Sequence, residues 1–241
     1  MSLKFTEVFW HYDSQAGVDT SGLENLFSHS EALRFEKMKF VLRRNSFIAG
    51  RRAAKQLLLR CVPELRDFAL WEISIENQEN GAPYARVNGQ RLPGTLSLSH
   101  SGQAAAAAYT PDPLIKFGID LDLIAPRADS FLDTYLTQSE LRWVRSTHED
   151  ERVIVGNLIW SAKEAVLKAL QTGLRVDTRE IEITTDGSPL VDSWYRFEVN
   201  KNNDRKNNWQ GFWRKEGEMI LTLVIGCNNQ YETIHLDQIV Y

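Results

Sequence analysis

The sequence predicts an α+β protein in two halves, each of which mixes helices with strands. Its 241 residues allow one large domain or two smaller ones. The segment Pro111-Asp-Pro113 interrupts the middle of the chain, which is typical of a boundary. On both sides of it the elements run loosely in the order strand, helix, strands. We therefore divide the chain into residues 1–112 and 113–241.

Periodicity and turn residues predict the elements of the first half. In order, these are a strand at 4–12, helices at 23–27, 30–40 and 43–60, and strands at 68–75, 95–99 and 104–109. Alanine favours helix by intrinsic propensity. The alanine-rich run at 104–109 is nevertheless short and flanked by turns, so we interpret it as a strand. A turn is predicted at 80–84.

The second half begins with a strand and ends in a run of strands. Its predicted elements are a strand at 117–124, helices at 137–146 and 151–171, and strands at 181–184, 194–199, 209–215, 218–227 and 232–236. Thr137 and Glu140 have the spacing of a capping box, which opens the first of these helices. Gly173 is a natural stop for the second. A polar loop is predicted at 201–208.

Composition excludes several classes of protein. Apolar residues make up 43% of the chain and charged residues 25%, so a packed core is expected rather than disorder. The net charge of -4 implies no global attraction to nucleic acid or to an anionic membrane. The isolated cysteines Cys61 and Cys227 fit neither a metal spacing nor a disulfide framework. With no signal-peptide shape and no apolar run that could span a bilayer, a cytoplasmic protein is expected.

The helical segment Trp160–Leu170 carries the first candidate site. Its apolar residues give it a core-facing side. Glu164 and Lys168 lie four positions apart and therefore share one face. At 100° per residue, Lys163 falls nearer the apolar side than the solvent side. Most such Glu–Lys pairs are solvated salt bridges, but this helix has little purely polar surface.

An upstream strand carries a second acidic group. Asp120 and Asp122 alternate with apolar residues, so both carboxylates face the same way. A solvated strand face is the common interpretation of this pattern. Two aspartates that are shielded from water would repel each other, and a divalent cation would remove that cost. Oxygen ligands favour Mg²⁺ over zinc.

The helix at 43–60 is strongly basic on one side. Arg44, Arg51 and Lys55 fall within a narrow arc, where they repel one another unless an anion is bound. The alternatives are a solvated basic face and a phosphate clamp, for which the forked arginine geometry is suited. Ser99 and His100 end a predicted strand, where hydroxyl, imidazole and backbone N–H groups together suit an anionic ligand.

Taken together, these segments resemble the 4'-phosphopantetheinyl transferases, specifically the larger, monomeric type that activates peptide and polyketide synthases. The motifs are Gly118-Ile-Asp-Leu-Asp122, Trp160-Ser-Ala-Lys-Glu-Ala-Val-Leu-Lys168, Ser99-His-Ser101 and the basic helix. Their order and spacing match over about residues 34–175. The Trp-x-x-Lys-Glu-Ala-x-x-Lys and Gly-Ile-Asp motifs are specific to that family in combination.

The resemblance implies a fold, a reaction and a set of partners. The fold would be two similar, pseudo-symmetric α+β halves with coenzyme A in the cleft between them. The enzyme would move the phosphopantetheine arm of coenzyme A to a serine of an apo acyl or peptidyl carrier protein and release adenosine 3',5'-bisphosphate. Neither nucleic acid nor a membrane is implied as a partner.

The same resemblance assigns roles to the candidate residues. It implies that Asp120, Asp122 and Glu164 hold Mg²⁺, or Mn²⁺ in its place, on the pyrophosphate. Glu164 would take the proton of the carrier serine, and Lys168 would stabilise charge on the leaving phosphate. The predicted coenzyme A contacts are Arg44, Arg51, Ser99, His100, Lys163 and Lys168.

Two positions depart from the family's pattern. The family often has glutamate at the position of Asp122, whose shorter side chain would reach the metal through water. It tends to have arginine at the position of Ser46, so Arg44 or Arg51 would take over the 3'-phosphate.

Two other functions remain as alternatives. One is a different Mg²⁺ enzyme, such as a nuclease or phosphatase, that uses the same three acids. The acidic net charge and the lack of basic tracts with interleaved aromatic residues are unfavourable for a nucleic-acid substrate. The other is a non-catalytic module that binds carrier proteins, which would have no use for a metal site.

Overall fold

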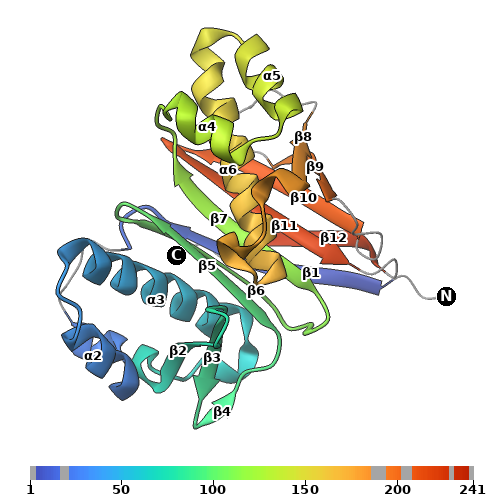
Figure 1. The fold of residues 1–241 in the computed structure, drawn as a ribbon. Coiled ribbons are helices and arrows are strands. Elements are labelled where there is room, and N and C mark those ends of the chain that lie inside the picture. The colour runs from blue at the N-terminus through green and yellow to red at the C-terminus, as the bar shows by residue number, and fades with distance from the viewer. Residues whose placement is uncertain (1–3, 17–21, 186–193, 202–207, 228–230, 239–241) are drawn as a thin grey trace. The chain divides into compact units, whose positions relative to one another are not determined.

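The protein was analysed as a computed structural model that describes residues 4–16, 22–185, 194–201, 208–227 and 231–238. Apart from its two ends, the predicted loop at 201–208 lies outside the described residues. The chain divides into two compact units (Figure 1). The first unit comprises Met1–Ile115 with Gln230–Tyr241, and the second comprises Lys116–Asn229.

This division differs from the predicted one at both ends of the second half. The boundary falls between Ile115 and Lys116 rather than after residue 112. The last strand also returns to the first unit, because it pairs in parallel with the first strand of the chain from Lys4↔Tyr231 to Trp10↔Gln238. Such pairing between the two ends of a chain leaves no local signal in the sequence.

The first unit contains three helices, two short 3-10 turns and seven strands among its described residues. In chain order they are β1 (Lys4–Asp13), α1 (Leu23–Leu26), α2 (His29–Glu36), α3 (Val41–Cys61), the 3-10 turns Pro63–Leu65 and Leu70–Glu72, β2 (Ile73–Asn77), β3 (Pro83–Val87), β4 (Gln90–Arg91), β5 (Thr95–Ser101), β6 (Ala104–Thr110) and β12 (Tyr231–Gln238). The strands form one sheet in the order β12-β1-β6-β5 and a smaller one in the order β2-β3-β4.

Helix α3 packs along the larger sheet of this unit (Figure 1). The alanine-rich run is strand β6, as predicted, and Ala105 and Ala107 lie in one core cluster with Ala49 and Ala53 of α3. Tertiary packing therefore decides the conformation of this run against the helix propensity of alanine.

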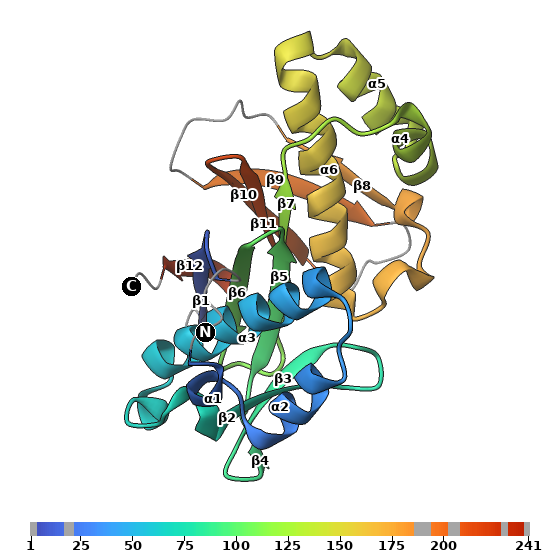
Figure 2. The same ribbon diagram turned by 90° about the vertical axis from the view of Figure 1, so that its left-hand side faces the viewer.

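The second unit contains three helices, two 3-10 turns and five strands among its described residues. They are β7 (Lys116–Leu123), α4 (Asp129–Tyr135), α5 (Gln138–Ser146), α6 (Glu149–Leu170), the 3-10 turns Gly173–Arg175 and Thr178–Glu180, β8 (Ile181–Thr184), β9 (Tyr195–Lys201), β10 (Asn208–Glu216) and β11 (Met219–Cys227). The strands form an antiparallel sheet in the order β7-β11-β10-β9-β8. Figure 2 shows α4 and α5 beside the N-terminal half of α6.

Helix α6 lies directly against strand β7, and Gly118 makes this possible. A Cβ atom at Gly118 would lie 2.1 Å from the backbone oxygen of Ala165 and 2.7 Å from the backbone nitrogen of Ala169. The Gly-Ile-Asp motif thus has a packing role at its first position, because only glycine allows so close an approach of helix to strand.

Most predicted elements are present, but strands β3 and β4 and helix α4 were not predicted as such, and some bounds differ. The strand predicted at 68–75 begins only at Ile73, after the turn Leu70–Glu72. The predicted turn at 80–84 already contains the first residues of β3. Helix α4 was not predicted, and it has no side-chain cap that would have indicated its start. Among the described residues, no helix is both long enough and apolar enough to cross a bilayer.

We expect Gly118→Ala to lower the free energy of unfolding by about 1–3 kcal/mol, because the added methyl group overpacks the contact between α6 and β7. Urea unfolding of the variant measures this. Gly156→Ala is the matched control, because a Cβ at that position of α6 would make only an ordinary contact of 3.7 Å with Leu132. The control should be neutral or stabilise by up to about 1 kcal/mol. Equal losses in both variants would contradict a special packing role for Gly118.

Candidate functional site

Strand β7 and helix α6 bring acidic and basic side chains together in the second unit. Asp120 is buried, with 6% of its surface exposed. Its carboxylate accepts hydrogen bonds from Ser161 Oγ at 2.7 Å and from Lys168 Nζ at 2.7 Å. Lys168 Nζ also donates to the backbone oxygen of Ile119 at 3.1 Å. Strand β7 and the predicted Trp160–Leu170 helix thus bring Asp120, Ser161 and Lys168 together.

Asp122 has a partner that the sequence reasoning missed. Its carboxylate is bound by Arg127, whose Nε donates to Asn157 Oδ1 at 2.9 Å. The Arg127 guanidinium carbon also lies 4.6 Å from the ring centre of Phe131 and 5.7 Å from that of Trp160. Hydrogen bonds and aromatic rings therefore hold this arginine in place. Its position five residues after Asp122, beyond the end of the strand, gave no periodic signal.

Glu164 is the third carboxylate of the group. Burial raises the pKa of Glu164 above its ordinary value, with further rises from Asp120 and Asp122 that Lys168 and Arg127 oppose. Burial likewise raises the pKa of Asp122, which Arg127 opposes and Asp120 reinforces. We name Asp120, Asp122 and Glu164 the acidic cluster. Its charges repel one another in a partly desolvated place, rather than lying on the solvated strand face that is the common interpretation of such alternation.

The donor chemistry of the acidic cluster suits a hard divalent cation. Within the described part of the chain, no three His, Cys, Asp or Glu side chains are grouped closely enough to hold a metal ion, and this includes the predicted ligands Asp120, Asp122 and Glu164. Mg²⁺ does not need such a cage, because it is usually held by one or two carboxylates, with water and substrate phosphates as the other ligands. A cation would also relieve the repulsion that raises the pKa of Glu164.

Lys163 lies elsewhere, although it was predicted to contact coenzyme A. Its side chain is fully buried, and Nζ pairs with Glu140 at 2.7 Å and donates to the backbone oxygens of Tyr135 at 3.1 Å and Thr178 at 2.9 Å. The periodicity placed Lys163 near the apolar side correctly. The prediction of a ligand contact does not agree with this position, because all three ammonium donors are used inside the unit.

A cationic cavity of about 460 Å³ lies in the first unit. Arg34 of α2, Arg43 and Arg51 of α3 and His100 of β5 line it, and none of the described residues around it is acidic. Apolar side chains that include Phe47 complete its wall. Three guanidinium groups beside one hollow favour a multiply charged anion such as a phosphate.

Arg51 is the most constrained cation of this cavity. Its guanidinium carbon lies 3.6 Å from the ring centre of Phe47, and Nη2 donates to the backbone oxygen of Ile75 at 3.4 Å. Glu31 Oε1 lies 3.8 Å from its Nε. Burial lowers the pKa of Arg51 to about 10, which Glu31 opposes and Arg34 reinforces. An anionic ligand would offset the cost of this buried charge.

The basic residues that line the cavity are not quite the predicted ones. Arg51 and His100 line it, whereas Arg44 and Ser99 do not. Arg44 stacks on Phe35 at 4.0 Å, and Ser99 is buried one position before His100 on β5, hence on the opposite face of the strand.

The third cation of the predicted basic arc, Lys55, is buried and pairs with Glu31. The carboxylate of Glu31 therefore neutralises Lys55, and no bound anion is needed for it. The sequence contained a signal for Arg43, which was not predicted to line the cavity. Arg43, Phe47 and Arg51 follow one another at intervals of four and therefore share one face of the helix.

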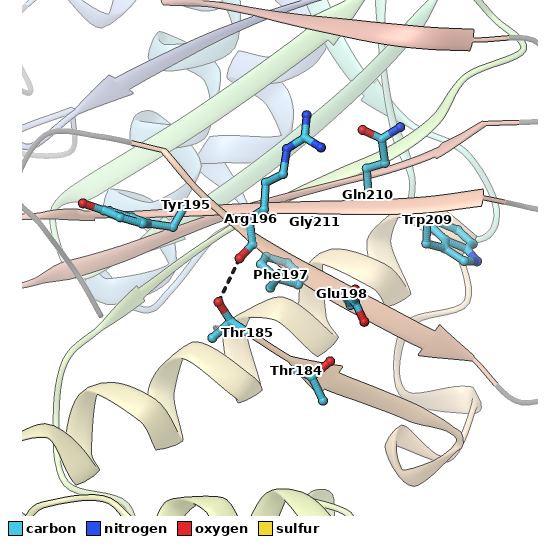
Figure 3. A pocket seen from close by; sticks show the side chains of 9 residues that line it. All are labelled: Thr184, Thr185, Tyr195, Arg196, Phe197, Glu198, Trp209, Gln210 and Gly211. Carbon is cyan, nitrogen blue, oxygen red and sulfur yellow. Dashed lines mark hydrogen bonds between the residues drawn. The ribbon is translucent and has the colours of Figure 1, made fainter. Parts of the chain in front are cut away.

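A second cavity, of about 580 Å³, lies along β8, β9 and β10 (Figure 3). Arg196 and Gln210 project to one side of the strands, and Phe197 projects to the other. Thr185 Oγ1 donates to the backbone oxygen of Arg196 at 2.8 Å. Glu198 is the one carboxylate among its described lining residues. This cavity therefore lacks the converging charges of the acidic cluster and of the cationic cavity.

The raised pKa of Glu164 has a measurable effect on stability. The folded protein holds this proton more tightly than the unfolded chain, so the free energy of unfolding falls as the pH rises above the ordinary value of 4.5. We expect Glu164→Gln to raise Tm at pH 7. At about pH 4, where Glu164 of the wild type is itself largely protonated, the variant should lose this advantage. Thermal unfolding at both pH values tests this, with the exposed Glu218→Gln as control. A lower Tm at pH 7 would contradict the destabilising charge.

Two sequence comparisons agree on one family. The family described as the 4'-phosphopantetheinyl transferase superfamily matches residues 116–223. A holo-[acyl-carrier-protein] synthase from Caldicellulosiruptor saccharolyticus is 38% identical over 89 residues, which cover 33% of this chain and 71% of that protein. A 4'-phosphopantetheinyl transferase, ffp, from Bacillus subtilis is 27% identical over 99 residues, which cover 40% of this chain and 43% of that protein.

Two solved structures are also similar in part. A holo-(acyl-carrier-protein) synthase from Bacillus anthracis in complex with CoA (3',5'-ADP) has a TM-score of 0.39 and 19% identity, over 46% of this chain and 94% of that one. A holo-[acyl-carrier-protein] synthase from Neisseria meningitidis has a TM-score of 0.39 and 19% identity, over 47% of this chain and 98% of that one. Because the chain is 38% identical to the Caldicellulosiruptor protein and residues 116–223 match the family, it belongs to the 4'-phosphopantetheinyl transferase superfamily.

Proposed function

We propose that the protein is a Mg²⁺-dependent 4'-phosphopantetheinyl transferase. It transfers the phosphopantetheine arm of coenzyme A to a serine hydroxyl of an apo acyl or peptidyl carrier protein and releases adenosine 3',5'-bisphosphate. The observation that carries the proposal is the convergence of Glu164 and Lys168 of α6 with Asp120 of β7. These residues lie inside the segment that matches the family.

The reaction is an attack of the serine oxygen on the phosphorus that bears the pantetheine. The new P–O bond forms while the bond to the second phosphate breaks, and the serine proton must leave. Such a transfer needs in-line positioning and neutralisation of charge, and it needs no covalent enzyme intermediate. The protein therefore has to supply a base, fixed cations and a place for both phosphates.

Glu164 is suited to the role of base. Burial and repulsion raise the pKa of both Asp122 and Glu164. Asp120 is bound by Lys168 and Ser161 and Asp122 by Arg127, so Glu164 is the carboxylate more available to accept a proton. A carboxylate with a raised pKa holds a proton better, so it is a more effective acceptor near neutral pH. Glu164 takes the serine proton directly or through one water molecule.

The cations of the second unit complete this arrangement. Lys168 is held by Asp120 and by the backbone oxygen of Ile119, so its charge is fixed before substrate arrives. It stabilises the negative charge that develops on the leaving phosphate. Asp120 and Glu164 would hold Mg²⁺, while Asp122 is bound by Arg127. The metal ion would supply charge neutralisation on the phosphates.

The cationic cavity of the first unit is proposed to bind the nucleotide end of coenzyme A. Arg34, Arg43 and Arg51 offer forked donors for the 3'-phosphate, and His100 adds a donor when protonated. Arg43 and Arg34 thus replace the arginine that the family tends to have at the position of Ser46. The absence of acidic side chains among the described lining residues supports an anionic ligand.

The alternative metal enzymes fit this molecule less well. A nuclease needs a surface that neutralises several phosphates, whereas the net charge of this chain is -4. A carrier-binding module without activity would not require Glu164 and Asp122 to remain charged in a partly buried place, because that arrangement is costly to stability.

The proposal is tested by intact-mass analysis of purified apo acyl and peptidyl carrier proteins incubated with the enzyme, coenzyme A and Mg²⁺. We expect the carrier to gain the mass of one phosphopantetheine arm, and a chelator to abolish the gain. Glu164→Gln should remove the transfer while coenzyme A binding stays within about tenfold of the wild type. A carrier that binds but gains no mass would instead identify a non-catalytic module.

The nucleotide site has a separate test. Arg51→Met should weaken binding of coenzyme A by about 10- to 100-fold, because a charge-assisted phosphate contact contributes about 1.5–3 kcal/mol. It should affect dephospho-coenzyme A much less, since that ligand lacks the 3'-phosphate. Isothermal titration of both ligands measures the difference, with Arg44→Met as control because Arg44 stacks outside the cavity. Equal losses for both ligands would exclude a role for Arg51 at the 3'-phosphate.

A further inference from the structure

The two units contain the same buried ion pair, built from equivalent parts. In each unit a short helix begins with a capping box whose glutamate, Glu31 or Glu140, pairs with a fully buried lysine of the long helix, Lys55 or Lys163. Lys55 and Glu31 are 0% and 1% exposed, as are Lys163 and Glu140. No repeat of residues signals this, apart from the segments Ser28-His-Ser-Glu31 and Thr137-Gln-Ser-Glu140.

The correspondence extends to the backbone partners. The second carboxylate oxygen of Glu31 accepts from the N–H of Ile75 on β2 at 2.8 Å, and that of Glu140 accepts from Ile183 on β8 at 2.9 Å. The spacing from lysine to strand is the same in both units, from 55 to 75 and from 163 to 183.

Each lysine also donates to the backbone oxygen two residues before the capping serine or threonine. These acceptors are Leu26, at 2.6 Å, and Tyr135, at 3.1 Å. The two Glu–Lys pairs therefore share these contacts, each connecting a long helix to a helix start and a strand, although Lys163 also binds Thr178 and Glu31 also lies near Arg51.

A gain in folding stability is not a sufficient reason for a buried ion pair of this kind. Desolvation of both charges offsets most of their attraction, and apolar replacements of similar volume are often as stable. Such pairs are instead able to fix one arrangement of the surrounding elements, because an unpaired buried charge makes every other arrangement costly. The repetition of the pair in both units points to a shared requirement of this kind.

In the second unit, the pair fixes the helix that bears the proposed base. Lys163 directly precedes Glu164 on α6, and its three partners come from α4, α5 and the turn before β8. A helix with its side chains has a radius of about 5–6 Å, so a rotation of α6 by about 20° would move a side-chain tip by about 2 Å. A displacement of about 1 Å is enough to cost about a hundredfold in rate at a reacting centre.

In the first unit, the pair lies under the cationic cavity. Glu31 binds Lys55 through one oxygen, and its other oxygen lies 3.8 Å from Nε of Arg51. Without the ammonium group of Lys55, Arg51 would become the nearest cation for this buried carboxylate. Glu31 would then draw the guanidinium away from the position from which it faces the cavity.

From these contacts we propose that the two ion pairs are positioning devices with separate tasks. Glu140–Lys163 holds Glu164 and Lys168 of α6 toward Asp120, and Glu31–Lys55 holds Arg51 at the cationic cavity. This inference rests on the proposed function, in which α6 acts on the transferred group and the cavity binds the nucleotide end of coenzyme A. Lys163 and Lys55 touch neither substrate in this proposal.

The test compares Lys163→Met with Lys55→Met, two equal changes at equally buried lysines. Four quantities are measured well below Tm: kcat, KM for coenzyme A, the dissociation constant of coenzyme A by isothermal titration, and Mn²⁺ affinity by electron paramagnetic resonance in the presence of coenzyme A. We expect Lys163→Met to lower kcat at least about tenfold and to weaken Mn²⁺ binding, with coenzyme A affinity within about threefold of the wild type.

Lys55→Met should show the opposite profile. We expect its dissociation constant for coenzyme A to rise at least about tenfold, with kcat within about threefold and Mn²⁺ affinity unchanged. Binding of dephospho-coenzyme A should change less, since Arg51 is proposed to read the 3'-phosphate. A purely structural role would move both variants in the same way or would change only Tm.

Because a single substitution leaves a buried glutamate without its lysine partner, the double variants Lys163→Met/Glu140→Gln and Lys55→Met/Glu31→Gln are measured as well. They should regain Tm relative to the single variants. The kcat of the first should stay impaired, because α6 has lost its anchor. The coenzyme A affinity of the second should partly recover, because without the charge of Glu31 nothing draws Arg51 away from the cavity. Recovery of kcat together with Tm in the first double variant, or no recovery of coenzyme A affinity in the second, would overturn the inference. If the wild type neither binds coenzyme A nor modifies a carrier, the proposed function fails; if it does both and the two variants share one profile, only the positioning roles fail.

Discussion

The acidic cluster depends on one close contact, that of helix α6 with strand β7 at Gly118. A side chain at this position would collide with the backbone of α6, so glycine alone lets the helix lie on the strand. The approach brings Asp120 within hydrogen-bond distance of Ser161 and Lys168. Side chains as short as serine and aspartate reach each other only across such a narrow gap. Gly118, which allows the close packing, and Asp120, which carries the charge, therefore act together on β7.

Charge in the cluster is balanced only in part, and this has a functional consequence. Lys168 pairs with Asp120 and Arg127 pairs with Asp122, while burial and repulsion raise the pKa of Glu164. A fully paired cluster would be more stable and less reactive. Sites that act on charged substrates commonly carry such destabilising groups, because the substrate or a metal ion completes their interactions. The cationic cavity shows the same imbalance with opposite sign, since its guanidinium groups surround a hollow with no described acidic neighbour in its wall.

The repeated Glu–Lys pair shows how one structural plan supports two different surfaces. Both long helices are held by a capping-box glutamate and a buried lysine, yet α3 presents arginines to a cavity and α6 presents a carboxylate and a lysine to a strand. Buried contacts specify where a helix lies and how it is rotated, and the neighbouring positions are free to carry different chemistry. This separation explains why the likeness of the two units is visible in contacts and hardly at all in residues.

The sequence by itself determined what depends on neighbours along the chain. Helical and strand periodicity placed Glu164 with Lys168 and Asp120 with Asp122, and it put Lys163 on the apolar side of its helix. Tertiary structure alone decided which group each buried charge meets: Lys163 meets Glu140, Asp122 meets Arg127, and β12 returns to β1. Periodicity fixes the face on which a side chain lies, whereas its partner is chosen by the packing of elements distant in sequence. That choice depends on desolvation and space, neither of which a local pattern records.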